Sequence, residues 1–120
     1  MGWQDSPKKT FTCGEDLAAH RRVKLKSGTT TQPPEVEYAD AGEDFIGVTE
    51  FAESSGELIT VRLKNAPGTV EIEASTVAAI GADLYGAADG KLSTTINGSV
   101  QAEALEASGA GGDVIEVLLV

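Results

Sequence analysis

The side chains most often used as general bases and strong nucleophiles occur once each in this chain, as His20 and Cys13. A Ser–His–Asp or Cys–His arrangement would have to use His20 in every version. His20 precedes Arg21 and Arg22, and this neighbourhood favours a solvent-facing position over a buried catalytic one. Cys13 lies in a segment without regular periodicity and is interpreted as a small apolar filler. The sequence therefore predicts no catalytic residue and a protein that is not an enzyme.

Metal and cofactor sites are also poorly supported. A single cysteine and a single histidine exclude a multi-thiolate zinc or iron–sulfur site and a histidine-rich site within one chain. Glu71 and Glu73 alternate with apolar residues, which is typical of the solvated side of a strand rather than of a catalytic acid pair. The segment 83–89 has too few acids for a calcium loop, and neither glycine-rich phosphate-binding motif is present. We expect no metal and no cofactor.

Charge narrows the choice of partners. The 120 residues include 9 Lys+Arg and 19 Asp+Glu, for a formal net charge of -10. Six of the basic residues lie in residues 1–27 with three acids, so the rest of the chain is strongly acidic. An acidic body repels nucleic acid and anionic membranes, and no apolar run approaches the roughly 20 residues of a membrane-spanning helix. The basic segment is interpreted either as a contact for an acidic protein surface or as a solvated tail.

The elements that would position any site are predicted to be strands. Short alternating segments recur at close spacing, at residues 20–26, 35–38, 45–51, 58–64, 69–74, 91–96 and 113–120. Residues 59–73 are predicted to form a hairpin, and a short helix could begin at Ser75. Residues 100–107 fit a strand or a helix. The pattern predicts an all-β fold, a small barrel-like or sandwich-like domain with at most one short helix.

The two ends of the chain differ from this pattern. Residues 1–16 are predicted to form an extended N-terminal arm, and residues 17–120 the β-rich domain. Trp3 and Phe11 are unusual in such an arm, since terminal aromatics either fold back on the core or anchor a partner. The terminal strand is apolar on both faces, which requires a cover on each side. We expect the second cover to be another subunit, with interface residues Val114, Ile115, Val117, Leu118 and Leu119.

Four segments in this order resemble the small head-decoration (capsid cement) proteins of tailed bacteriophages. They are AGEDFIGVTEF at 41–51, GADLYGAADGKLSTT at 81–95, QAEALEA at 101–107 and GGDVIEVLLV at 111–120. The resemblance covers residues 17–120. It implies a β-barrel-like or sandwich-like domain that forms trimers on the outer surface of the expanded icosahedral head. It further implies bridging of neighbouring major capsid proteins at three-fold sites, without catalysis, by a protein made in the host cytoplasm.

The arm is the predicted contact with the shell. Its basic and aromatic residues, with the two arginines that follow, form the hypothetical capsid contact: Trp3, Lys8, Lys9, Phe11, Arg21 and Arg22. Removal of residues 1–14 is then expected to abolish capsid binding and to leave a folded trimer. The alternative is a soluble β-barrel adaptor or a module that binds glycans or a host surface. Such a module should have a concave polar pocket, whereas a cement protein should have a broad flat contact surface.

Overall fold

The first half of the chain closes into a small β-barrel. The structure is a computed structural model that describes residues 7–120. The barrel order is β1-β3-β2-β4-β5, with β5 pairing back onto β1. Its strands are β1 (Lys8–Cys13), β2 (Arg22–Leu25), β3 (Glu35–Tyr38), β4 (Gly47–Thr49) and β5 (Leu58–Leu63).

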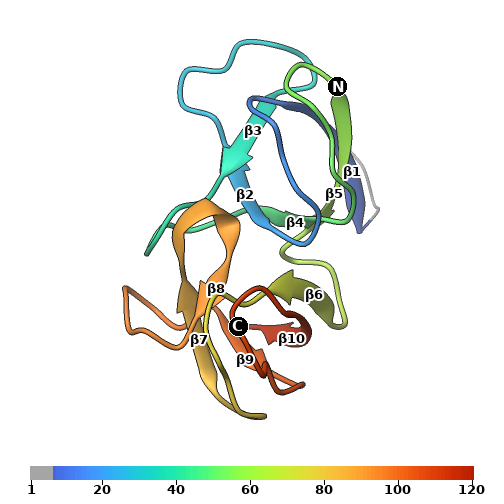
Figure 1. Ribbon diagram of the computed structural model, residues 1–120. Coiled ribbons are helices and arrows are strands. Elements are labelled where there is room, and N and C mark those ends of the chain that lie inside the picture. Colours follow the sequence, from blue (N-terminus) through green and yellow to red (C-terminus); the bar gives the residue numbers. More distant parts are fainter. Residues whose placement is uncertain (1–6) are drawn as a thin grey trace.

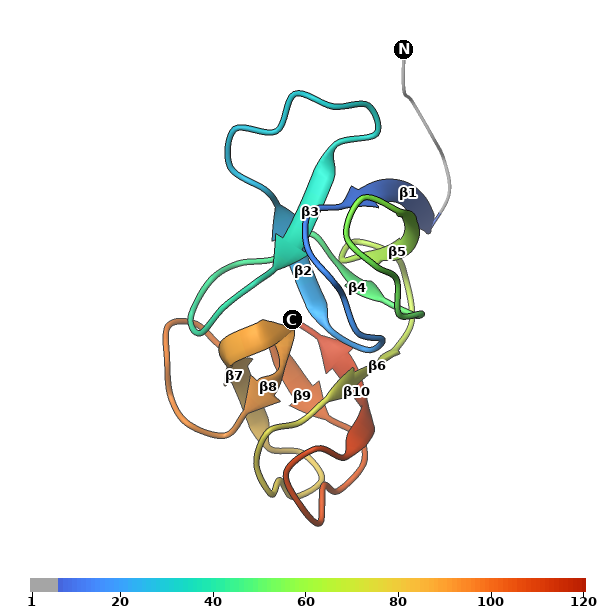
Figure 2. The same ribbon diagram turned by 45° about the horizontal axis from the view of Figure 1, so that its top comes forward.

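The second half forms an open five-stranded sheet below the barrel, in the order β6-β10-β9-β7-β8 (Figure 1). A single turn of 3-10 helix, η1 (Ala88–Gly90), precedes β8. Figure 2 shows the two lobes stacked, with the C-terminal end at their junction. The strands of this lobe are β6 (Val70–Glu73), β7 (Asp83–Gly86), β8 (Leu92–Ser93), β9 (Ala102–Ala104) and β10 (Val114–Leu119). The all-β prediction is confirmed, with one short helix in the described part of the chain.

The predicted arm is wrong over residues 8–13, because these residues form β1. This strand pairs antiparallel with β5 and parallel with β3, so it closes the barrel. Phe11 lies opposite Ile59, and both Phe11 and Cys13 are buried in the barrel core. The alternation of Phe11 and Cys13 with exposed or half-buried threonines is the strand signal that the sequence analysis missed. The predicted single β-rich domain at 17–120 contains two lobes, and the boundary between them lies near residues 64–69.

The predicted hairpin at 59–73 is also wrong. Both strands form, but β5 pairs with β1 and β4, whereas β6 pairs with β10 in the other sheet. The connecting loop crosses from one lobe to the other. Arg62 fixes this crossing, because its Nη2 donates a hydrogen bond to the carbonyl of Pro67 at 2.7 Å. The helix that could have begun at Ser75 is absent, and residues 100–107 contain the strand β9.

Two apolar clusters stabilise the lobes. The barrel cluster includes Phe11, Val23 and Ile59. The second cluster combines the inward residues of β6, β9 and β10 with Ala39, Phe45 and Val48 of the barrel half. Because the second core draws side chains from both halves, the lobes are packed together rather than linked by a free tether.

Candidate functional site

Arg22 lies at the junction of the two lobes and is 0% exposed. Its guanidinium donates hydrogen bonds of 2.8 to 3.1 Å to the backbone carbonyls of Ala39, Ala87, Lys91 and Glu43 and to Oε1 of Gln101. Burial lowers the pKa of Arg22 to about 10, so the side chain remains charged at neutral pH. This arginine is a structural link between β2 and the second lobe, and the prediction that it contacts a capsid is wrong.

The backbone around Arg22 is shaped to admit it. A Cβ at Gly86 would lie 2.9 Å from Nη1 of Arg22, and one at Gly90 would lie 2.5 Å from the carbonyl oxygen of Arg22. Gly90 also has a φ of +74°, which other residues rarely adopt. These two glycines belong to the GADLYGAADGK segment, so part of that sequence pattern is explained by the buried arginine.

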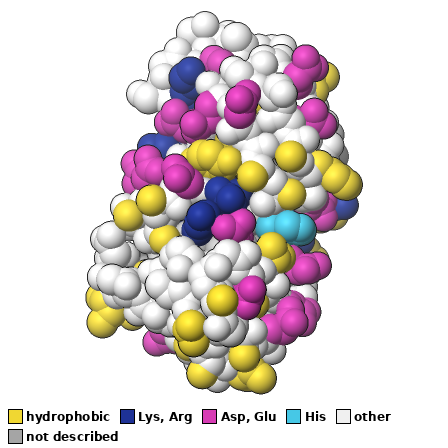
Figure 3. Space-filling view, viewed as in Figure 1, with side chains coloured by type: hydrophobic (Ala, Val, Ile, Leu, Met, Phe, Trp, Pro, Cys, Tyr) yellow, Lys and Arg dark blue, Asp and Glu magenta, His cyan; other side chains and the backbone are white. Residues whose placement is uncertain are grey.

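The other predicted contact residues are mostly engaged within the chain. Lys8 pairs with Glu50 at 2.9 Å, and Arg21 pairs with Glu73 at 3.1 Å. Lys9 is half-buried on β1, and Phe11 is in the barrel core. Trp3 lies outside the described residues. The basic character of residues 1–27 is therefore largely neutralised by acids from later in the chain, and Figure 3 shows both charges side by side where the lobes meet.

Two further ion pairs join the loop before β4 to β2 and to the residue after β5. Nζ of Lys24 lies 2.7 Å from Glu43, and Nζ of Lys64 lies 2.7 Å from Asp44. The hydrogen bond from Lys24 lowers the pKa of Glu43, and the hydrogen bond from Lys64 lowers the pKa of Asp44. The same contact raises the pKa of Lys24.

Acid is expected to destabilise the chain through Glu43 and Asp44. Their folded pKa values lie below the ordinary 4.5 and 3.8, so the unfolded chain takes up protons first as the pH falls. The stability that these two carboxylates contribute is fully present above their ordinary pKa values. It is lost as the pH falls through their lower pKa values in the folded chain. Urea unfolding from neutral pH to about pH 3 measures this effect. The free energy of unfolding should fall less steeply with acid in the E43Q/D44N variant than in the wild type. Asp83→Asn, at an exposed position on β7, is the control. If E43Q/D44N has the same pH dependence of the free energy of unfolding as the wild type, Glu43 and Asp44 are not responsible for the loss of stability in acid.

The two faces of β10 have different environments. Ile115 and Val117 are buried in the chain's own core, and Leu119 packs partly against that core. Burial of Ile115 and Val117 removes these two residues from the predicted subunit interface, whereas Leu119 is half-buried. Val114 and Leu118 point to the opposite face and are exposed. On β10, this outer face and the half-buried Leu119 are open to another subunit.

Exposed apolar side chains also gather at the far end of the second lobe. The segments 74–82 and 104–112 lie side by side there, joined by the Ala78–Ser108 bridge and by a hydrogen bond from Gly81 N–H to the Ala104 carbonyl. Residues 74–82 carry no charged side chain. Figure 3 shows hydrophobic side chains at this end of the molecule. We call this the distal apolar surface; its residues are Val77, Ile80, Leu105 and Val114.

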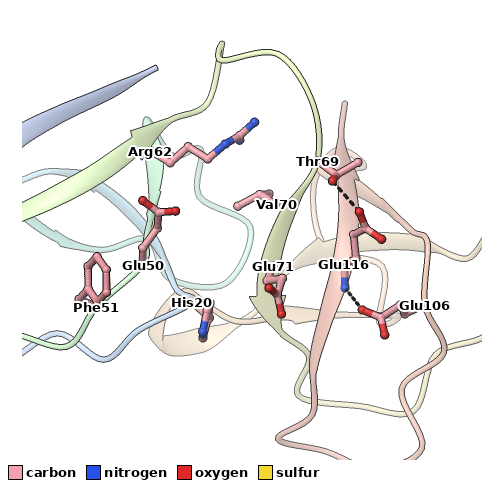
Figure 4. Close-up of a pocket in the computed structure, with 9 residues that line it drawn as sticks. All are labelled: His20, Glu50, Phe51, Arg62, Thr69, Val70, Glu71, Glu106 and Glu116. Atoms are coloured by element: carbon pink, nitrogen blue, oxygen red, sulfur yellow. Dashed lines mark hydrogen bonds between the residues drawn. The ribbon is translucent and has the colours of Figure 1, made fainter. Parts of the chain in front are cut away.

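A groove of about 530 Å³ separates the barrel from the outer side of the second sheet (Figure 4). The barrel supplies one wall and the strands β6 and β10, with the β9–β10 connection, supply the other. No sequence pattern predicts this site, because its residues come from distant segments that share no motif. They are His20, Glu50, Phe51, Arg62, Thr69, Val70, Glu71, Glu106 and Glu116.

A second hollow, of about 500 Å³, is mainly apolar. It lies where the barrel meets the C-terminal end, between Phe45, Ile46 and Leu63 on one side and Leu119 and Val120 on the other. Within residues 7–120, we find no group of three or more His, Cys, Asp or Glu side chains that could hold a metal ion. The described part of the chain likewise has no helix long and apolar enough to cross a membrane.

Comparison with solved structures relates this fold to a phage protein. The chain is similar to the N base of the head fibre gp8.5 of bacteriophage phi29, with a TM-score of 0.77 and 18% sequence identity. The similarity covers 94% of this chain and 92% of that chain, so it includes both lobes. No protein-family model matches the sequence, and no curated protein matches it. At this identity the comparison establishes a shared fold.

Proposed function

We propose that this chain is a structural protein of a bacteriophage head, a decoration protein on the outer surface of the capsid. The observation that carries the proposal is the match of both lobes to a head-fibre base, with a TM-score of 0.77. The sequence resemblance to head-decoration proteins was drawn from other features, the order of four segments. The two lines of argument point to the same location in the virion.

In this proposal the protein binds the major capsid protein after head expansion and stabilises the shell by bridging neighbouring subunits as a trimer. Several weak contacts made by one trimer would add into tight binding. The distal apolar surface is the better candidate for self-contact, because its exposed apolar side chains lie beside residues 74–82, which carry no charge that would repel a second acidic copy. Leu118 adds to the exposed apolar area on β10. Synthesis in the host cytoplasm, as expected for a head protein, belongs to the same proposal.

Co-sedimentation with expanded heads that lack decoration tests the head assignment. We expect saturable binding at a fixed ratio to the shell subunit, and no binding to unexpanded heads. Light scattering after size exclusion tests the trimer separately. Ile80→Lys and Val114→Lys should yield monomers, whereas Leu25→Lys, at an exposed site on the barrel, should leave the trimer intact. A folded protein that never binds expanded heads would overturn the head assignment, and a monomeric wild type would overturn the trimer.

A further inference from the structure

The groove between the lobes has an open strand edge along one wall. In the second sheet β6 is the edge strand, with β10 on its inner side. The N–H of Glu73 points away from β10, since it donates a hydrogen bond to the carbonyl of His20 at 2.9 Å. Amide groups two residues apart along a strand point to the same side, so the N–H of Glu71 faces the groove. Beyond Glu73 the edge is occupied, because Ala74 bridges to Leu92 of β8 and the N–H of Ser75 donates a hydrogen bond to the Leu92 carbonyl. The open stretch is therefore residues 69–71, and it is a template for pairing with a short extended polypeptide.

The side chains around this edge favour a bound segment that carries positive charge. Glu71 is exposed on β6, and Glu106 and Glu116 stand on the same side of the groove. Glu116 accepts a hydrogen bond from Thr69 Oγ1 at 2.6 Å, and Glu106 accepts one from the backbone N–H of Glu116 at 2.7 Å. These contacts hold two carboxylates in place at the groove without neutralising their charge.

The barrel wall adds an aromatic surface that a polypeptide could use. Phe51 is 63% exposed beside Glu50 and offers an aromatic surface for an aliphatic or cationic side chain. An aromatic surface, carboxylates and a strand edge thus line one groove (Figure 4).

We propose that this groove binds an extended, basic segment of a partner protein, which adds as a strand to the open edge of β6 and places Lys or Arg side chains beside Glu71, Glu106 and Glu116. A second copy of this chain fits less well, because its net charge is -10 and Lys8, Arg21, Arg22, Lys24, Lys64 and Lys91 are already paired or buried. The proposal does not depend on attachment to a phage head.

Fluorescence anisotropy with a defined peptide tests the site. The probe is a short fluorescein-labelled peptide in which lysine alternates with threonine and valine, and the matched peptide has glutamate in place of lysine. We expect the lysine peptide to bind below about 1 mM and more weakly as salt increases, and the glutamate peptide not to bind. Glu71→Lys should weaken binding about fivefold, as expected for a reversed charge at an exposed site. Asp83→Lys changes the net charge equally outside the groove and should have little effect.

Amide hydrogen exchange distinguishes strand addition from diffuse attraction. The N–H of Glu71 should become protected when the peptide is bound. The amides of β8, which meets the end of β6 at the Ala74–Leu92 bridge and lines no part of the groove, should not. Absence of binding, or an equal loss in Glu71→Lys and Asp83→Lys, would overturn the site. Binding without protection of Glu71 would overturn the strand pairing. Because these measurements use the isolated chain, their outcome is separate from that of co-sedimentation with heads.

Discussion

Replacement of Arg22 by methionine is expected to lower the free energy of unfolding by about 3–5 kcal/mol. Methionine fills much of the space but donates no hydrogen bond. The carbonyls of Ala39, Ala87 and Lys91 would lose their donor inside the lobe junction. A loss of this size approaches the whole stability of a small domain. Urea unfolding followed by circular dichroism measures it directly.

The neighbouring arginine supplies a matched control. Arg21 is partly exposed, pairs with Glu73 and lies over the Tyr38 ring at 5.6 Å from its centroid. Arg21→Met should therefore lower the free energy of unfolding by only about 1 kcal/mol. If Arg22→Met leaves too little folded protein to measure, Arg22→Lys keeps the charge with fewer donors and should still be clearly less stable than Arg21→Met. Equal, small losses for Arg21→Met and Arg22→Met would show that Arg22 does not hold the lobes together.

The same pair of arginines shows where sequence reasoning succeeds and where it stops. Alternation along residues 20–26 correctly separated Val23 from Arg22, because neighbouring side chains in a strand point to opposite faces. The polar face was then expected to be on the surface, with Arg22 in the capsid contact. In the structure the second lobe covers that face at Arg22, and only the tertiary arrangement could reveal this. Local alternation predicts that a strand forms and which residues share a face, but it does not identify what packs against each face.

Strand partners were hard to predict for a related reason. The loop Asn65-Ala66-Pro67-Gly68 has strong turn chemistry, and a hairpin between its flanking strands was the natural expectation. The chain instead uses this loop to pass from the barrel to the second sheet, where β6 pairs with β10 more than 40 residues later. The pairing is determined by burial of two separate cores. For the same reason the groove, built from residues 20 to 116, left no signature in the sequence.

Charge segregation along the chain was similarly misleading. A basic N-terminal region and an acidic remainder suggest a basic arm that binds an external acidic surface. The fold brings the two regions together instead, so that Lys8 meets Glu50 and Arg21 meets Glu73. Three of the acids for which the described structure shows no ion pair, Glu71, Glu106 and Glu116, lie on the sheet side of the groove. The proposed partner of this groove is therefore basic rather than acidic.

Deletion of residues 1–14 is expected to unfold the barrel. The deletion removes β1, which pairs with both β3 and β5, and takes Phe11 and Cys13 out of the core. The barrel would be left open between two unpaired edges. Loss of one buried aromatic residue alone costs about 3–5 kcal/mol, so Phe11→Ala should already be severely destabilised. Thermal unfolding followed by circular dichroism should show no cooperative transition for the deletion. A folded trimer after this deletion, as an arm at residues 1–16 would allow, would contradict the role of β1.

Deletion of residues 1–6 separates folding from capsid contact. This shorter deletion retains β1 and the hydrogen bond from the Leu63 N–H to the Pro7 carbonyl, so we expect an unfolding transition close to that of the full chain. It removes Trp3, one of the predicted capsid-contact residues, which lies outside the described part of the chain. If Trp3 anchors the chain to the shell, heads should bind this folded variant more weakly, and Trp3→Ala should reproduce the loss. Full occupancy by both variants would instead assign the capsid contact to the described surface, where the exposed residues of the barrel and the groove remain.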